Sequence, residues 1–120
     1  MRKLSVMFAA TLLVGAAAVG SAHAAAQTKF WNLTSNTVDG FWLAPAGTTN
    51  WGENQALNDN DKTVDHDERL KIKNVKTGTY DAKFTDVRGR SCIVKGVKVV
   101  EGDIFTIDEK DVKKDACGKK

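Results

Sequence analysis

The sequence predicts a small all-β protein, an antiparallel β-sandwich of about six to seven strands with a long acidic loop. Segments rich in β-branched and aromatic residues recur at intervals of about 8–12 residues, with Gly, Asp and Asn turns between them. An apolar repeat of 3.6 residues, which would indicate helices, is almost absent. The 120 residues suffice for one domain.

Residues 1–26 have the layout of a secretory signal peptide. Arg2 and Lys3 precede an uncharged apolar run over residues 4–19, and a small-residue stretch offers cleavage after Ala24 or Ala26. The run is shorter than the ~20 residues that a membrane span needs. We therefore expect a periplasmic protein with no membrane span, whose mature single domain comprises residues 27–120.

Alternating apolar and polar residues define the expected strands of this domain. Phe41 and Trp42 are adjacent, so alternation cannot turn both side chains inward, and one of them is expected to be exposed. The other aromatic residues of the strands, Trp31 among them, are expected in the core. Only residues 109–117 could form a short C-terminal helix. The expected strands lie at residues 28–34, 38–44, around Leu70 with a possible start near Val64, 80–85, 91–100 and 104–107.

Cys92 and Cys117 are the only cysteines, and an exported protein meets an oxidising compartment. We therefore expect a disulfide between them. Closing a loop of about 25 residues stabilises a fold by roughly 3 kcal/mol in the chain-entropy account.

Charge and residue inventory argue against two classes of function. Removal of the leader leaves 16 basic against 15 acidic residues, a net charge of +1, so the overall charge gives no evidence for nucleic-acid binding. His66 is the only histidine outside the leader, which argues against a Ser-His-Asp or Cys-His hydrolase. We expect a protein that is not an enzyme and has no catalytic residues.

One connection, from Pro45 to about Thr63, is longer than the ~12–15 residues usual for a loop that binds nothing. It leads into the densest acidic stretch, residues 53–68, where six carboxylates face Lys62 alone and the local charge is −5. Oxygen ligands of this kind suit a hard cation such as Ca²⁺ or a lanthanide(III) ion, whereas softer metals prefer thiolate or imidazole. The candidate metal ligands are Asp59, Asp61, Asp65 and Asp67, followed by Glu68 and Glu53.

The ligand hypothesis depends on a strand that starts at Val64, because period two would then project Asp65 and Asp67 side by side. The stretch is not an EF-hand loop, since Val64 and Leu70 stand where Gly and Glu are required. Two alternatives stay open. The first is that the stretch is a solvated acidic loop. The second is that the stretch is the acidic side of an interaction module that docks a basic partner. The second rests on the polarised charge of the chain, since residues 69–98 carry nine basic against two acidic residues.

Several short motifs follow one another along the mature chain: Ala44-Pro45-Ala46-Gly47, Trp51-Gly52, Leu57 and Tyr80-Asp81. In these the chain resembles a group of small exported bacterial β-sandwich proteins that includes the periplasmic lanthanide-binding chaperones of methylotrophic bacteria. The resemblance implies non-enzymatic binding of a lanthanide(III) ion with metal-linked pairing of two subunits into a homodimer. A periplasmic acceptor protein is a further expected partner.

Overall fold

The structure, a computed structural model, describes residues 26–120. The expected signal peptide lies outside the described residues except for Ala26. Seven strands follow in order, with three short 3₁₀ turns and no α-helix among the described residues. The strands are β1 (Lys29–Leu33), β2 (Val38–Pro45), β3 (Arg69–Lys71), β4 (Gly78–Asp86), β5 (Arg90–Val99), β6 (Ile104–Asp108) and β7 (Cys117–Lys119).

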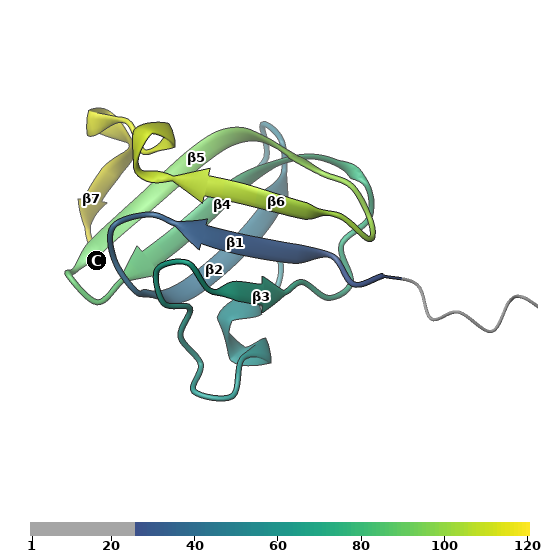
Figure 1. The fold of residues 1–120 in the computed structure, drawn as a ribbon. Coiled ribbons are helices and arrows are strands. Elements are labelled where there is room, and N and C mark those ends of the chain that lie inside the picture. Colours follow the sequence, from purple (N-terminus) through teal and green to yellow (C-terminus); the bar gives the residue numbers. More distant parts are fainter. Residues whose placement is uncertain (1–25) are drawn as a thin grey trace, which may run out of the picture.

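These strands form two packed sheets, as the sequence predicts for an all-β sandwich (Figure 1). The smaller sheet has the order β3-β1-β6 and the larger one the order β2-β4-β5-β7. All pairs in the larger sheet are antiparallel, but β1 and β6 run parallel, with Phe30 beside Phe105. The expectation of a wholly antiparallel fold is wrong at this pair. The reason is topological, because β6 follows β5 of the other sheet and therefore does not form a hairpin with β1.

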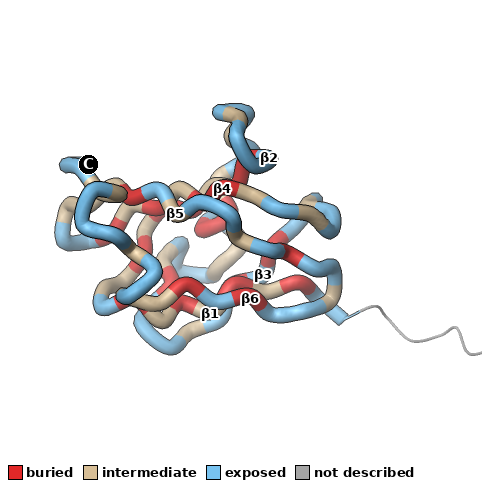
Figure 2. The backbone as a smooth tube through the Cα atoms, turned by 90° about the horizontal axis from the view of Figure 1, so that it is seen from above, coloured by how far each residue is buried: buried red, intermediate tan, exposed pale blue. Residues whose placement is uncertain are grey.

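The core lies between the sheets and is rich in aromatic side chains. The rings of Phe30 and Phe41 stack with centroids 4.3 Å apart, and Phe105 packs against both. Alternation along β2 turns Phe41 inward and Trp42 outward, as period two requires (burial along the chain is shown in Figure 2). The prediction that Trp31 is a core residue is wrong, since alternation in β1 buries its neighbours Phe30 and Asn32 and places Trp31 half-exposed on the outer face.

The C-terminal segment contains no α-helix, which corrects the expectation for residues 109–117. Two 3₁₀ turns, η3 (Glu109–Asp111) and η4 (Lys114–Ala116), occupy it. Asp108 caps the first turn by accepting from the Lys110 backbone N–H at 3.0 Å. The chain then enters β7, where Cys117 pairs with Cys92 of β5. The expected disulfide between these two cysteines is confirmed.

Candidate functional site

The acidic stretch, residues 53–68, forms a separate lobe below β2 and β3 in Figure 1, called the acidic lobe from here on. Amide side chains attach its base to the sheets. Asn54 Oδ1 accepts from the Phe41 backbone N–H at 2.9 Å, and Gln55 bonds both the N–H and the C=O of Lys73 at 2.9 Å. Gln55 and Ala56, in the 3₁₀ turn η2 (Gln55–Asn58), are buried. The lobe therefore rests on an ordered base although it contains no strand.

Three carboxylates of the lobe accept local hydrogen bonds from backbone N–H or hydroxyl groups. Asp59 accepts from the backbone N–H of Asp61 at 3.2 Å, and Asp61 accepts from the hydroxyl of Thr63 at 3.0 Å. Glu68 accepts from the backbone N–H of Asp65 at 2.8 Å. These are Asx-type and turn contacts, which fix loop conformation without demanding a ligand.

Asp65 and Asp67 point to different partners. Asp65 Oδ1 accepts from the hydroxyl of Thr37 at 3.1 Å, whereas Asp67 Oδ1 accepts from the indole N–H of Trp31 at 3.0 Å. The expected strand from Val64 is therefore wrong in this part of the chain. Val64 bridges Val38 of the larger sheet, and the strand β3 begins only at Arg69 in the smaller sheet.

A turn lies between those two positions because the chain must cross from one sheet to the other. Asp67 takes up a left-handed conformation with φ of 72°, which Asp tolerates better than most residues. A turn breaks the period of two, so the two carboxylates do not project side by side. Val64, Leu70 and Ile72 are nevertheless buried, as the apolar pattern indicates.

Asp59 and Asp61 are the pair of candidate ligands that the structure brings together. The pKa of Asp59 is raised by a hydrogen bond shared with the Asp61 carboxyl group, by partial burial and by the charges of Glu68 and Asp61, although the Asp61 backbone N–H opposes the rise. The pKa of Asp61 is lowered by the same shared bond and by bonds from Thr63. The opposite directions of the two shifts follow from the interaction of these carboxyl groups with each other.

Among residues 26–120 no three Asp, Glu, His or Cys side chains gather closely enough to hold a metal ion. A hard cation needs several converging oxygens, so the six candidate ligands do not fit a closed metal site in this conformation. Glu53 is exposed at the start of the lobe, and Asp65 and Asp67 are held by Thr37 and Trp31. The lanthanide or calcium site therefore stays a prediction.

The charge of the lobe is not neutralised within the described part of the chain. The ion pairs found there join Arg90 to Asp86 and Glu109, Lys110 to Asp108, and Lys120 to Asp39. None of them includes a carboxylate of the acidic lobe. Lys62 is the one basic residue within residues 53–68, and Arg69, which stacks 4.2 Å from the Trp31 ring, follows directly after them. The lobe therefore carries an excess of negative charge.

Residues of the Pro45-Ala46-Gly47, Trp51-Gly52 and Tyr80-Asp81 motifs meet on the outer face of the larger sheet. The buried side chain of Asp81 accepts from the Gly47 N–H at 3.0 Å. The ammonium group of Lys83 lies 4.9 Å from the ring of Trp42 and 4.8 Å from the ring of Trp51, so that it stands between two indoles. Trp51 therefore anchors the loop, and these motifs carry structure. Trp42 pairs with Lys83 across β2 and β4. The signal in the sequence that could have indicated this pairing is that both residues occupy outward-facing positions of the alternating pattern.

A partly buried ion cluster, not anticipated from the sequence, joins Asp86, Arg90 and Glu109. The side chain of Asp86 is fully buried and accepts from Arg90 Nε at 2.7 Å. The same guanidinium forms two bonds to Glu109, at 2.8 and 3.2 Å. The bonds from Arg90 lower the pKa of Glu109 to about 2, although partial burial opposes the shift. Burial would raise the pKa of Asp86, but the hydrogen bonds from Arg90 and Asn36 lower it overall.

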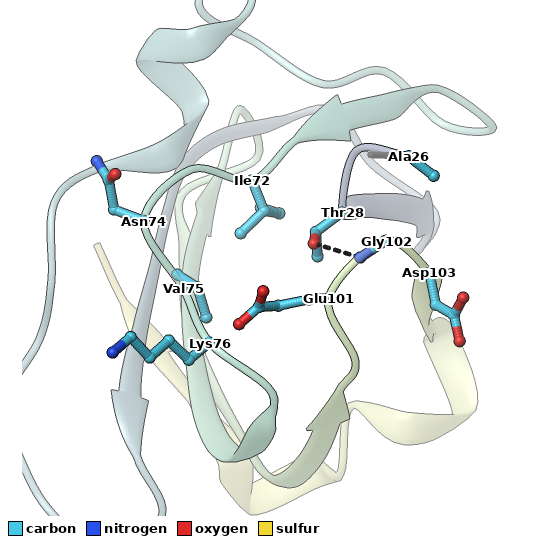
Figure 3. Close-up of a pocket in the computed structure, with 9 residues that line it drawn as sticks. All are labelled: Ala26, Thr28, Ile72, Asn74, Val75, Lys76, Glu101, Gly102 and Asp103. Carbon is cyan, nitrogen blue, oxygen red and sulfur yellow. Dashed lines mark hydrogen bonds between the residues drawn. The ribbon is translucent and has the colours of Figure 1, made fainter. Parts of the chain in front are cut away.

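A hollow of about 870 Å³ lies beside the Val100–Asp103 turn, where the described chain begins (Figure 3). Its wall includes Thr28, whose hydroxyl accepts from the Gly102 N–H at 2.9 Å, together with Ile72, Lys76 and Glu101. It contains none of the six candidate ligands and no histidine or cysteine.

No helix within residues 26–120 is both long and apolar enough to cross a membrane. Comparison of the chain with protein-family models, with curated proteins and with solved structures finds no match. The resemblance to exported lanthanide-binding proteins thus stays an expectation drawn from short motifs.

Proposed function

We propose that this protein is a non-enzymatic, exported interaction module whose acidic lobe docks a basic region of a periplasmic partner protein. The observation that carries the proposal is the absence of ion pairs at the six carboxylates of the lobe within the described residues. Exposed like charges raise the electrostatic free energy of the folded protein, and a partner of opposite charge lowers it.

The spacing of the carboxylates favours a macromolecular partner over a single ion. A metal ion needs oxygens that converge within about 2.5 Å of one point, whereas a basic protein surface needs only distributed charge. The carboxylates of Asp61, Asp65 and Asp67 are directed to Thr63, Thr37 and Trp31 respectively. They therefore spread over the lobe surface in the manner that suits steering of a charged partner.

Titration with a decalysine peptide tests the proposal. The variant Asp59→Asn, Asp61→Asn, Asp65→Asn keeps side-chain shape and an acceptor oxygen but removes three charges from the lobe. We expect its affinity for the peptide to fall at least 10-fold at low ionic strength, and the wild-type affinity to fall steeply with added salt.

The matched control is Glu101→Gln, Asp103→Asn, Asp115→Asn, which removes the same charge from exposed positions outside the lobe. We expect this control to bind within about twofold of the wild type. Equal loss of affinity in both triple variants would show that net charge, and not the lobe, governs binding.

A hard cation is the second candidate ligand, and the Asp59–Asp61 contact favours it. A cation would relieve the repulsion between these two carboxylates, and rearrangement of the lobe could bring Glu68 to the same ion, since its charge already acts on Asp59. In this account a lanthanide(III) ion or Ca²⁺ completes its oxygen shell from a second chain, which yields a metal-bridged homodimer.

Isothermal titration with La³⁺ and with Ca²⁺ separates the two candidates. Heat at a defined stoichiometry, abolished by Asp65→Asn with Asp67→Asn, supports the cation site. Sedimentation with and without La³⁺ tests the bridged pair, and a monomer under both conditions contradicts it. Binding of decalysine without any heat from either ion supports the docking module alone.

A further inference from the structure

The strand β6 forms an edge of the smaller sheet, on the side away from β3 and the acidic lobe. Its pairing with β1 begins with the bond from Lys29 N–H to Asp103 O at 3.1 Å. In a parallel ladder, alternate residues direct both backbone groups to the same neighbour. Asp103, Phe105 and Ile107 therefore face β1, and the backbone groups of Ile104 and Thr106 face outward.

No strand pairs with this outward side of β6 within the described residues. The next backbone N–H of β6 that faces outward is that of Asp108, and it donates to the Asp111 carboxylate at 2.9 Å. The N–H and C=O groups of Ile104 and Thr106 thus remain as a short free ladder. Free ladders of this kind are templates for the addition of a further strand.

The other long edges of the two sheets are protected, and β6 is not. The free part of β5 carries exposed Lys95 and Lys98 and a bulge at Gly96, with φ of 73°. Along β2, the Phe41 N–H is bonded by Asn54 of the acidic lobe. Lysines, bulges and covering loops are the usual devices that prevent pairing at an edge. The sequence of β6, Ile-Phe-Thr-Ile-Asp, has none of them.

A groove of about 470 Å³ lies between this edge and β5 and is lined by residues of both strands. The apolar part of the groove wall comes from Ile104, which is 50 % exposed, and from the half-buried Val97. Positive charge comes from Lys95 and Lys98, and the lining contains one carboxylate, that of Asp111. The groove thus combines a backbone ladder with apolar and cationic side-chain contacts.

We propose that β6 accepts an extended peptide, in which apolar residues alternate with Asp or Glu, as an added strand along residues 104–107. The pleat turns alternate side chains of an added strand to opposite faces. The groove offers both apolar contacts, at Val97 and Ile104, and positive charge, at Lys95 and Lys98. A second copy of this chain is a poorer occupant, because pairing of two β6 strands about a twofold axis would place Lys95 and Lys98 of both copies at one seam. This surface is independent of the acidic lobe and has the opposite charge preference.

The test uses a fluorescent, end-blocked Val-Glu-Val-Glu-Val-Glu-Val peptide and its Val-Lys counterpart. We expect saturable one-to-one binding of the Val-Glu peptide by fluorescence anisotropy and at least 10-fold weaker binding of the Val-Lys peptide. Amide exchange followed by NMR should show new protection at Ile104 and Thr106, because their N–H groups become bonded in an added strand.

Charge reversal with a matched control completes the experiment. Lys95→Glu with Lys98→Glu should weaken the Val-Glu peptide at least 10-fold and strengthen the Val-Lys peptide. Lys71→Glu with Lys73→Glu makes the same charge change away from β6 and should leave Val-Glu binding within about twofold. Lack of saturable binding, equal affinity for both peptides, or a peptide-free dimer that already protects Ile104 and Thr106 would each overturn the proposal.

Discussion

Removal of the Arg90 side chain is the sharpest test of how the sandwich is held together. Arg90 is the cation that joins the fully buried Asp86 to Glu109. The substitution Arg90→Met keeps much of the side-chain length and apolar contact but deletes all three guanidinium bonds. It therefore isolates the electrostatic contribution of this residue.

The expected loss of stability follows from the burial of Asp86. Removal of one partner from a buried ion pair costs about 3–5 kcal/mol, since the other charge remains without compensation. Asp86 keeps the backbone N–H groups of Arg88 and Arg90 at 3.0 and 3.1 Å and the Asn36 amide at 3.1 Å, which places the loss near the low end. The Glu109 side chain is 43 % exposed and adds at most about 1 kcal/mol. We expect a total near 3 kcal/mol.

Urea unfolding followed by far-UV circular dichroism measures this loss. With a slope of about 1–3 kcal/mol per molar urea, the midpoint should fall by about 1–3 M. Arg88→Met is the matched control on the same hairpin, because the exposed Arg88 side chain takes part in none of the ion pairs of the described residues. We expect the control to stay within about 0.5 kcal/mol of the wild type. Equal stability of the two variants would refute the assignment of Arg90 as the compensating charge.

The same variant should change the response to acid. The pKa of Glu109 is lowered in the fold from 4.5 to about 2, and that of Asp86 is also lowered, so the folded protein binds fewer protons than the unfolded chain. This contribution to stability is present above pH 4.5 and is lost as the pH falls toward 2. Arg90→Met should flatten the decline in unfolding free energy over that range, and an unchanged slope would contradict the account.

Two further predictions concern the disulfide and the outer face of the larger sheet. Replacement of Cys92 and Cys117 together by Ala should lower the free energy of unfolding by about 3 kcal/mol, measured by urea titration of the oxidised and variant proteins, and no loss would argue against the bridge as a stabilising element. Gly40→Ala places a Cβ 2.5 Å from the Trp42 ring, so it should lower the free energy of unfolding by about 1–3 kcal/mol and shift the tryptophan emission. The Cβ added by Gly118→Ala meets nothing within 4 Å, so this control should change neither the stability nor the emission.

The acidic lobe shows where inference from local pattern fails. Period two placed Asp65 and Asp67 on one face of a strand, but that inference assumes that the strand exists. The chain instead crosses between sheets after Val64, and the carboxylates turn to Thr37 and Trp31. The partner of Glu109 was equally out of reach, because Arg90 lies 19 residues earlier in the chain.

The sequence by itself determined what depends on local pattern and on residue inventory. Alternation was enough to give an all-β fold and to place Phe41 and Trp42 on opposite faces, since a strand sends successive side chains to opposite sides. The structure then decided that Phe41 is the one that faces inward. The presence of a single pair of cysteines was enough to give the bridge from Cys92 to Cys117. Only the tertiary structure decided which sheet each strand joins, and thereby the parallel pairing of β1 with β6, the free edge of β6 and the direction of every carboxylate in the acidic lobe. Those features depend on contacts between residues far apart in the chain, which a local pattern of polarity does not encode.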